Sequence, residues 1–373
     1  MAVLFIIFEE LKHVGKMKHK KTIVQGVQEK GYKLKRIRVD DEELELINNL
    51  RTLWNEAIDN GLNPKEVKHG WIKKEGASLF LKNHSYTSPE QNQLEKTFEK
   101  LVEDYKNYSP QYPTIQREKQ DNAHLLVISP ADVHIGKLCR AFETGEEYNQ
   151  QIAVKRVLKG VQSIINKVQS FKIDKILFII GNDVLHTDTP NKTTKGTPQD
   201  TDGMWYDNFR TAVKLYVDVI EILLTVADVH VDFNPSNHDY QSGWFFSQLL
   251  EAHFRLSHNI TFNCNISHRK YFHYHDNLIG SSHGDGAKPQ DLPLLMAHEA
   301  KEWSSCKHKY IYTHHLHHKV SKDYMGVCVE ALRSPSGSDS WHHINGYQHA
   351  PKALEGFLHD KLHGQVARFT HIF

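Results

Sequence analysis

Histidine, aspartate and asparagine side chains recur in short groups along the second two-thirds of the chain. The sequence holds 27 histidines in 373 residues, an excess that directs attention to their spacing. Histidine is the commonest metal ligand in proteins, and mixed Asp, Asn and His donors suit Mn²⁺, Fe or Zn²⁺. Five groups combine these types: Asp132-Val133-His134, Gly181-Asn182-Asp183, Ser236-Asn237-His238-Asp239, His283-Gly284-Asp285 and His314-His315-Leu316-His317-His318. They predict a metal site with nitrogen and oxygen ligands and no thiolate.

The spacing within two of these groups supports a shared site. In extended backbone, side chains at positions i and i+2 point the same way. Asp132 and His134 can then reach one ion, and His315 and His317 can face one cluster. Each group alone is more typical of a turn or a helix cap, but all five in this order indicate a metal site rather than coincidence.

Each group directly follows a short apolar run that is typical of a buried strand. Strands are predicted at 124–129, 175–180, 228–233, 259–263, 271–275, 277–282, 308–313 and 326–332, and helices at 150–169, 203–226, 242–256 and 290–303. Strands that alternate with helices are typical of an α/β domain. Ligands of open α/β sheets collect beyond the carboxyl ends of the strands, so five such ends are expected to converge.

The five groups together resemble the calcineurin-like metallophosphoesterase superfamily over about residues 124–335. The resemblance implies an α/β fold in which a β-sandwich is flanked by helices, in four αββα layers, and two divalent metal ions, manganese first, with iron, zinc or magnesium as alternatives. It implies that one ion takes Asp132, His134, Asp183 and His317, and that the other takes Asp183, Asn237, His283 and His315. His238, paired with Asp239, matches the family's non-ligand histidine that assists the leaving group.

The sequence departs from the family pattern at two places. The second motif is normally Gly-Asp, whereas here it is Gly181-Asn182-Asp183. We align Asp183 because His186 then lies three residues beyond it, as in the nuclease branch of the family. The glycine that normally begins the Gly-His-x-His motif is replaced by His314.

The residues after the second motif bear on the substrate. Protein phosphatases of the superfamily usually continue with valine-aspartate-arginine-glycine, whereas this chain has Val184-Leu185-His186-Thr187. The Asp183 and His186 pair resembles the double-strand-break repair nucleases, in which such a histidine helps position or protonate the nucleic-acid phosphate. We therefore predict a DNA nuclease, an exonuclease-like enzyme of phage type. The alternatives are a small-molecule phosphodiesterase or phosphomonoesterase, and a nucleic-acid-binding factor whose phosphoesterase fold is incidental.

A polar segment follows the second motif directly. Residues 187–202 are rich in Thr and Pro and carry Lys192 and Lys195, which are compatible with binding a DNA backbone. Trp205 and Tyr206 could stack on bases, or they could belong to the core of the helix predicted over 203–226. Both interpretations remain open from the sequence.

The first third of the chain differs from the rest in its residue pattern and charge. We expect a basic, mainly helical region at 1–110, a linker at 111–123 and the metallophosphoesterase domain at 124–373. A basic run covers 12–38, a helical pattern covers 44–58, a shorter helix is expected at 65–73, and Ser88 begins a charged helix that runs to about 107. The helix pair and the basic run could bind nucleic acid or a partner, including a second copy of the chain, but a structural helix pair and a solvated arm are the more common outcomes.

Composition sets the remaining bounds. With 46 basic and 45 acidic side chains the net charge is +1, so any attraction to polyanions must be local. The four cysteines include no Cys-x-x-Cys pair, which argues against a zinc ribbon and favours a reduced, cytoplasmic location. No apolar segment is long enough to span a bilayer, residues 2–8 make a poor signal peptide, and Met17 is an alternative start. Further histidines near the C-terminus are expected to be structural or exposed: His342, His343, His349, His359, His363 and His371.

Overall fold

The computed structural model describes residues 21–23, 37–39, 49, 52–74, 77–83, 110–118 and 120–373. The chain divides into two compact units, Met1–Lys106 and Asn107–Phe373, and each is described by itself. None of the helices in the described part is both long and apolar enough to cross a membrane.

The described residues of the first unit contain both a helix and a β-hairpin. Residues 52–59 are helical, as the pattern predicts, and Leu53 and Ala57 form its buried side. The helix expected at 65–73 is wrong, because a 3-10 turn, η2 (Pro64–Glu66), leads instead into a hairpin of β3 (His69–Lys74) and β4 (Ala77–Lys82). Cross-strand pairing here overrides a weak local helical pattern.

Within the basic run at 12–38, the structure describes only residues that belong to two short strands. These are β1 (Lys21–Ile23) and β2 (Ile37–Val39), which pair antiparallel. The rest of that run, and the helix expected to begin at Ser88, lie outside the described residues.

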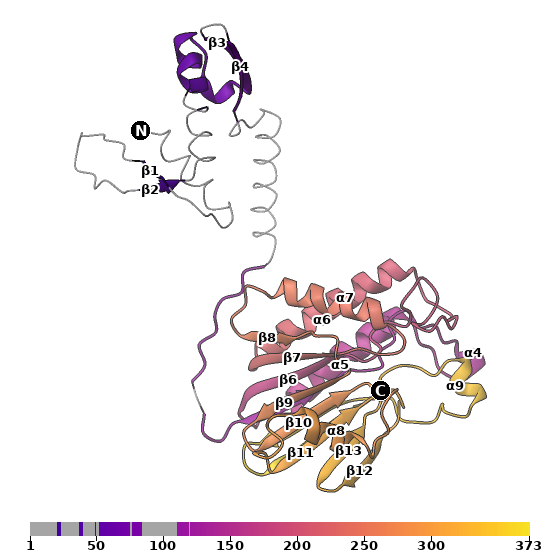
Figure 1. The fold of residues 1–373 in the computed structure, drawn as a ribbon. Helices are drawn as coiled ribbons and strands as arrows, with labels where there is room; N and C mark the ends of the chain where they lie inside the picture. The colour runs from indigo at the N-terminus through magenta and orange to yellow at the C-terminus, as the bar shows by residue number, and fades with distance from the viewer. Residues whose placement is uncertain are drawn as a thin grey trace. The chain divides into compact units, whose positions relative to one another are not determined.

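The second unit has four layers, with helices on both outer faces of two stacked sheets (Figure 1). In spatial order, the larger sheet contains β15 (Gly364–Ile372), β14 (Ala353–Asp360), β5 (His124–Ile128), β6 (Ile173–Gly181), β7 (Asp228–Asn234) and β8 (Ile260–Asn263). The smaller sheet contains β12 (Val320–Tyr324), β13 (Val327–Ala331), β11 (His308–Thr313), β10 (Asn277–Ser282) and β9 (Arg269–Tyr274). The helices are α4 (Ala141–Thr144), α5 (Gln150–Lys167), α6 (Trp205–Leu224), α7 (Tyr240–His253), α8 (Leu292–Glu299) and α9 (Ser340–Ile344). The expected α/β fold class, a β-sandwich flanked by helices, is confirmed.

Strand alternation separates two of the apolar cores. On β5, Leu125 and Val127 face the core between the sheets, while Leu126 and Ile128 face the core beneath α5, α6 and α7. Strand β6 repeats this alternation, which is why both strands read as continuous apolar runs. A third core lies between the smaller sheet and α8.

The topology brings the polar groups to one edge. Strands β5, β6, β7 and β8 are parallel, and in the smaller sheet β10, β11 and β13 are parallel. The residues that follow β5, β6 and β7 therefore leave the larger sheet at the same edge.

The segment expected as a linker has no helix or strand in its described residues, but it is fastened to the second unit. Tyr112 stacks on Phe254 with ring centroids 5.1 Å apart. The backbone N–H of Ile115 donates to the side chain of Asn259 (2.8 Å), whose amide donates back to the carbonyl of Ile115 (2.9 Å). These contacts make the segment part of the second unit's surface rather than a free tether.

Candidate metal centre

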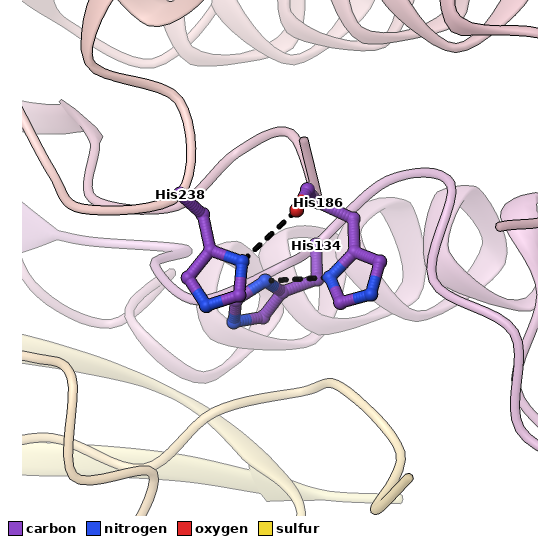
Figure 2. A group of neighbouring side chains, drawn as sticks. All are labelled: His134, His186 and His238. Atoms are coloured by element: carbon purple, nitrogen blue, oxygen red, sulfur yellow. Dashed lines mark hydrogen bonds between the residues drawn. The ribbon is translucent and has the colours of Figure 1, made fainter. Parts of the chain in front are cut away.

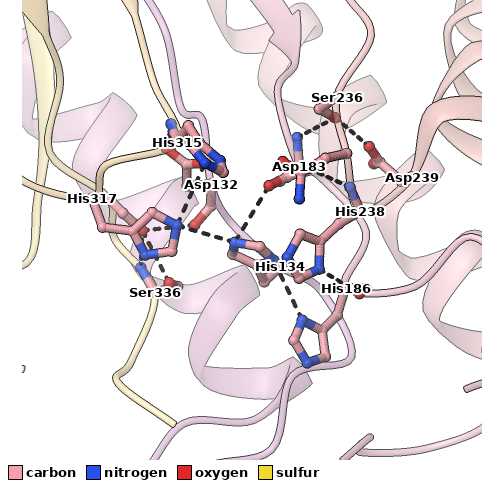
Figure 3. A network of polar contacts seen from close by, with 12 residues as sticks. Asp132, His134, Asp183, His186, Ser236, His238, Asp239, His315, His317 and Ser336 are labelled. Carbon is pink, nitrogen blue, oxygen red and sulfur yellow. Dashed lines mark hydrogen bonds and ion pairs between the residues drawn. The ribbon is translucent and has the colours of Figure 1, made fainter. Parts of the chain in front are cut away.

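Side chains from both sheets converge where their strands end (Figure 3). Asp132, His134 and His317 bring donor atoms within 4.8 Å of one another, and Asp183, His283 and His315 do the same. The first group combines the loop after β5 with the loop after β11. The second combines the loops after β6, β10 and β11.

In the first group, two imidazole nitrogens face each other beside a buried carboxylate. Nε2 of His134 lies 3.2 Å from Nε2 of His317, and the latter lies 3.5 Å from Oδ1 of Asp132. Two ring nitrogens at this separation can share at most one proton between them. The arrangement is suited to a cation that accepts a lone pair from each.

Asn237, the remaining predicted ligand, lies beside the second group. Nε2 of His283 lies 3.2 Å from Oδ2 of Asp183 and 2.8 Å from Oδ1 of Asn237. The same Oδ2 of Asp183 lies 3.9 Å from Nε2 of His134 in the first group. One carboxylate oxygen is therefore within reach of both groups, as a bridging ligand requires.

The charge states suit cation binding. Burial is the largest influence on Asp132 and Asp183 and opposes their ionisation, but the neighbouring groups together, led by His317 and His283 respectively, hold the pKa of each carboxyl below its usual value. Burial lowers the pKa of His134 and of His317, so both rings are neutral and offer lone pairs. Burial also opposes charge on His283, but the nearby carboxylates prevail and raise its pKa to about 9. The first group therefore offers an ionised carboxylate and neutral imidazoles to a cation, whereas a cation in the second group would have to displace the proton of His283.

The backbone at the centre is held in an uncommon conformation. Six of its residues have positive φ: Asp132 (50°), His134 (48°), Asn182 (56°), Asp183 (60°), His315 (70°) and His317 (57°). The i, i+2 argument from extended backbone is therefore wrong for these motifs, because their side chains converge from left-handed loop residues. Each such residue costs about 1–3 kcal/mol and persists only where its surroundings enforce it. A cluster of this kind is typical of a functional site.

Backbone hydrogen bonds tie the loops together. The N–H of Asp132 donates to the carbonyl of Asn182 (2.7 Å), and the N–H of His134 donates to the carbonyl of Asp183 (2.9 Å). Gly181 has φ +81°, and a Cβ there would lie 2.2 Å from the carbonyl oxygen of Asn234. Glycine is required at this turn by both conformation and space.

His186 and His238 lie beside the first group (Figure 2). Nδ1 of His186 is 3.3 Å from Nδ1 of His134, and the rings of His186 and His238 stack with centroids 5.4 Å apart. These three histidines could also hold a metal ion by proximity. Because His134 also belongs to the first group, this set is an alternative arrangement around the same ring rather than a separate site.

The pairing expected between His238 and Asp239 is corrected. Asp239 instead accepts hydrogen bonds from Ser236 Oγ (2.5 Å) and from the N–H of Leu185 (2.8 Å). Nδ1 of His238 donates to the carbonyl oxygen of His186 at 2.9 Å. Asp239 thus links the loops that follow β6 and β7, and burial is the main cause that raises its pKa to about 7. The His186 backbone, rather than Asp239, orients His238.

The His-His-Leu-His-His run divides its members between the two donor groups, the interior and the surface, rather than bringing His315 and His317 to one cluster. His315 and His317 point into the two groups. Nε2 of His314 lies 2.8 Å from Ser129 Oγ in the interior, and Nδ1 of His318 bonds the carbonyl of Leu316 at the surface. His314 therefore supports the loop at the position where the motif that the run resembles has glycine.

The two lysines predicted to bind substrate lie outside these groups. Lys192 and Lys195 are exposed on the loop that follows β6. In the part of the chain that the structure describes, neither side chain forms a hydrogen bond or an ion pair with the centre. Their role stays a prediction.

Sequence reasoning missed a set of residues behind His317. Lys137 is buried and pairs with Asp339, which in turn binds His342, and the His342 ring stacks on His317. His342 was expected to be structural or exposed. The available signal was Lys137, a charged residue only three positions after His134 in the same loop.

Comparisons with known proteins add a distant structural likeness only. No family model matches the sequence, and no curated protein matches it. Among solved structures, an archaeal phosphodiesterase is 8% identical, with a TM-score of 0.32 over 67% of this chain and 99% of that one. Vacuolar protein sorting 29 from Cryptosporidium parvum is 13% identical, with a TM-score of 0.31 over 68% and 99%. A hypothetical protein from Pyrococcus horikoshii is 11% identical, with a TM-score of 0.33 over 66% and 87%. Because these values are low, the proposals below depend on the chain's own geometry.

Proposed function

We propose that the chain is a metal-dependent phosphoesterase that hydrolyses phosphodiester bonds with two divalent cations, and that its substrate is DNA. The observation that carries the proposal is the position of Asp183, whose Oδ2 lies 3.2 Å from His283 and 3.9 Å from His134. When bound, a pair of cations neutralises phosphate oxygens and makes water a stronger nucleophile at neutral pH. We infer Mn²⁺ first, because the donors are carboxylate, amide and imidazole.

His238 is the proposed proton donor to the leaving oxygen. A carbonyl only accepts hydrogen bonds, so the contact with the His186 carbonyl requires a proton on Nδ1 of His238. Nε2 is then the atom that takes up or releases a proton during the reaction. His186 lies behind His134 and, like Asp239, is proposed to position the centre rather than to touch phosphate.

A pocket beside the centre supports a nucleotide substrate. Its volume is about 340 Å³, and its lining includes Thr187, which follows His186, and Gln241, two residues after Asp239. Trp205 and Phe245 also line it and are half exposed, at 50% and 48%. Of the two interpretations that the sequence left open for Trp205, its exposure favours base stacking. Lys192 and Lys195 lie on the loop after β6 that also carries Thr187, and they are proposed to contact the DNA backbone.

The size of the pocket also supports a second candidate. A cavity of this volume lies at the lower end for small-molecule sites, so a mononucleotide-sized phosphodiester is the alternative substrate. A nucleic-acid-binding factor without catalysis is the third candidate, and it would need the same donors to hold cations without turnover.

The test uses the full chain with Mn²⁺ and, separately, Mg²⁺ or Zn²⁺. End-labelled single- and double-stranded DNA are assayed beside bis(p-nitrophenyl) phosphate and p-nitrophenyl phosphate. We expect metal-dependent cleavage of DNA and of the diester. Cleavage of the monoester alone would contradict the nuclease proposal, and bound metal without any turnover would favour the binding role.

A further inference from the structure

Lys137 is an unusual residue to find beside a metal centre. Its side chain is 1% exposed, and it lies three residues after His134 in the loop that follows β5. A buried ammonium is stable only where a counter-charge and hydrogen bonds compensate it. Its Nζ lies 2.9 Å from Oδ2 of Asp339, which supplies the counter-charge.

Asp339 uses its second oxygen to fix a histidine. Oδ1 of Asp339 accepts a hydrogen bond from the backbone N–H of His342 (3.0 Å) and a second from Nδ1 of its ring (2.6 Å). Asp339 is thereby the N-cap of α9. Both the backbone and the ring of His342 are held by one carboxylate that Lys137 anchors.

The ring of His342 covers one face of a predicted ligand. It stacks on His317 with centroids 5.1 Å apart and ring planes 23° from parallel. His317 needs such support more than its neighbours do, because its side chain is 12% exposed, against 2% for His134 and 0% for Asp132. It also lies in a loop outside any helix or strand, with φ +57°.

We propose that Lys137, Asp339 and His342 act as a positioning relay that holds the ring of His317 toward Asp132 and His134. The inference rests on the proposed function, because the ion it serves is the one in the first donor group. Hydrogen-bonded partners of metal-binding histidines set the orientation of the ring, and their loss typically weakens metal affinity about 10- to 100-fold. The stacked ring of His342 would set the orientation of His317 in the same way. The second group, around Asp183 and His283, has no contact with the relay among the described residues.

The experiment measures Mn²⁺ binding to the full chain by isothermal titration calorimetry. His342→Ala removes the ring that covers His317 and should weaken one of two sites about 10- to 100-fold while leaving the other unchanged. His342→Phe keeps a stacked ring and should recover most of the affinity. His343→Ala is the matched control, since His343 is the next residue of α9 but is exposed and binds Gln348.

A kinetic measurement separates positioning from catalysis. With bis(p-nitrophenyl) phosphate, His342→Ala should lose turnover at limiting Mn²⁺ and regain nearly the wild-type kcat at saturating Mn²⁺. A kcat that stays low at saturation would overturn a purely positioning role. Unchanged two-site binding in His342→Ala, or equal losses in His342→Ala and His343→Ala, would overturn the relay alone. Absence of Mn²⁺ binding in the wild type would overturn the proposed function and the relay together.

Asp339→Asn tests the anchor with little change in shape. It leaves Lys137 without its counter-charge, so the same site should weaken, and the metal-free protein should melt at a lower temperature. Retention of wild-type Mn²⁺ affinity in this variant would contradict the part assigned to Lys137 and Asp339.

Discussion

Asp183 carries more of the proposed chemistry than any other side chain of the centre. Its Oδ2 lies between a histidine of each donor group, and its Oδ1 accepts a hydrogen bond from the N–H of His238 at 3.0 Å. Asp183→Ala removes the donor that the two groups share. We predict that this variant loses both ions and all activity, as measured by elemental analysis after dialysis and by diester hydrolysis. Retention of one ion per chain would show that the carboxylate does not bridge.

His238 is predicted to respond differently to truncation. Its contact with Asp183 is made by the backbone N–H, so His238→Ala leaves the carboxylate's hydrogen bond in place. We expect normal metal content and a turnover reduced roughly 100- to 10,000-fold, the usual contribution of a general acid. If His238→Ala lost as much metal as Asp183→Ala, His238 would be a ligand, as its proximity to His134 and His186 permits.

At the scale of elements, strand order explains what the sequence could predict. The strands β5, β6, β10 and β11 read as apolar runs because their alternate faces meet two cores, and the polar groups follow them directly. Strand β7 instead alternates Val229, Val231 and Phe233, which face one core, with polar residues. The convergence of Asp132, Asp183 and His283 was therefore accessible from the sequence. The left-handed backbone that aims these side chains was not, because tertiary hydrogen bonds such as Asp132 N–H to the Asn182 carbonyl enforce it.

Other elements gave no clear sequence signal. Strand β14 interrupts its apolar residues with Glu355, Gly356 and His359. Glu355 and His359 find their hydrogen-bond partners in Arg333 and Tyr312, which lie far from them in the sequence. The five-residue α9 is too short for periodicity to predict. Because α9 was missed, the role of His342 behind His317 was missed with it.

His359 on β14 gives a prediction at this scale. Its ring is fully buried between the sheets, where Nε2 contacts the hydroxyl of Tyr312 on β11 at 2.9 Å. Burial lowers the pKa of His359 to about 3, so the unfolded chain binds this proton more readily than the folded one. Stability from this residue is complete above pH 6.5 and declines as the pH falls toward 3, with a loss of about 2 kcal/mol by pH 5.

Urea unfolding of the metal-free protein at pH 7 and pH 5 measures this effect. His359→Gln keeps an amide that can meet the Tyr312 hydroxyl but removes the titration, so its stability should change less between the two pH values. His363→Gln, at an exposed position on the adjoining turn, is the control and should retain the wild-type dependence. An unchanged pH dependence in His359→Gln would contradict the assignment.

At the scale of the second unit, the candidate metal centre joins the two sheets. Asp132, Asp183 and Asn237 follow strands of the larger sheet, whereas His283, His315 and His317 follow strands of the smaller one. The sheets also pack through the core between them. At this edge, by contrast, two carboxylates that repel each other and six residues with positive φ are brought together. Cations bound here would offset that repulsion and link the sheets, so metal binding should contribute directly to folding stability.

The prediction is a metal-dependent melting temperature for the second unit. A ligand that binds only the folded state adds about 2.7 kcal/mol at 100 times its Kd, for each independent site. Mn²⁺ should therefore raise the melting temperature of the wild type in a concentration-dependent way, and a chelator should reverse the increase. Asp183→Ala should melt at the same temperature with and without Mn²⁺, because both sites lack their shared donor. His238→Ala should keep the full increase, since its loss affects turnover and not binding. An increase of equal size in wild type and Asp183→Ala would mean that Mn²⁺ stabilises the chain elsewhere, and the two sheets would then be held together without the ions.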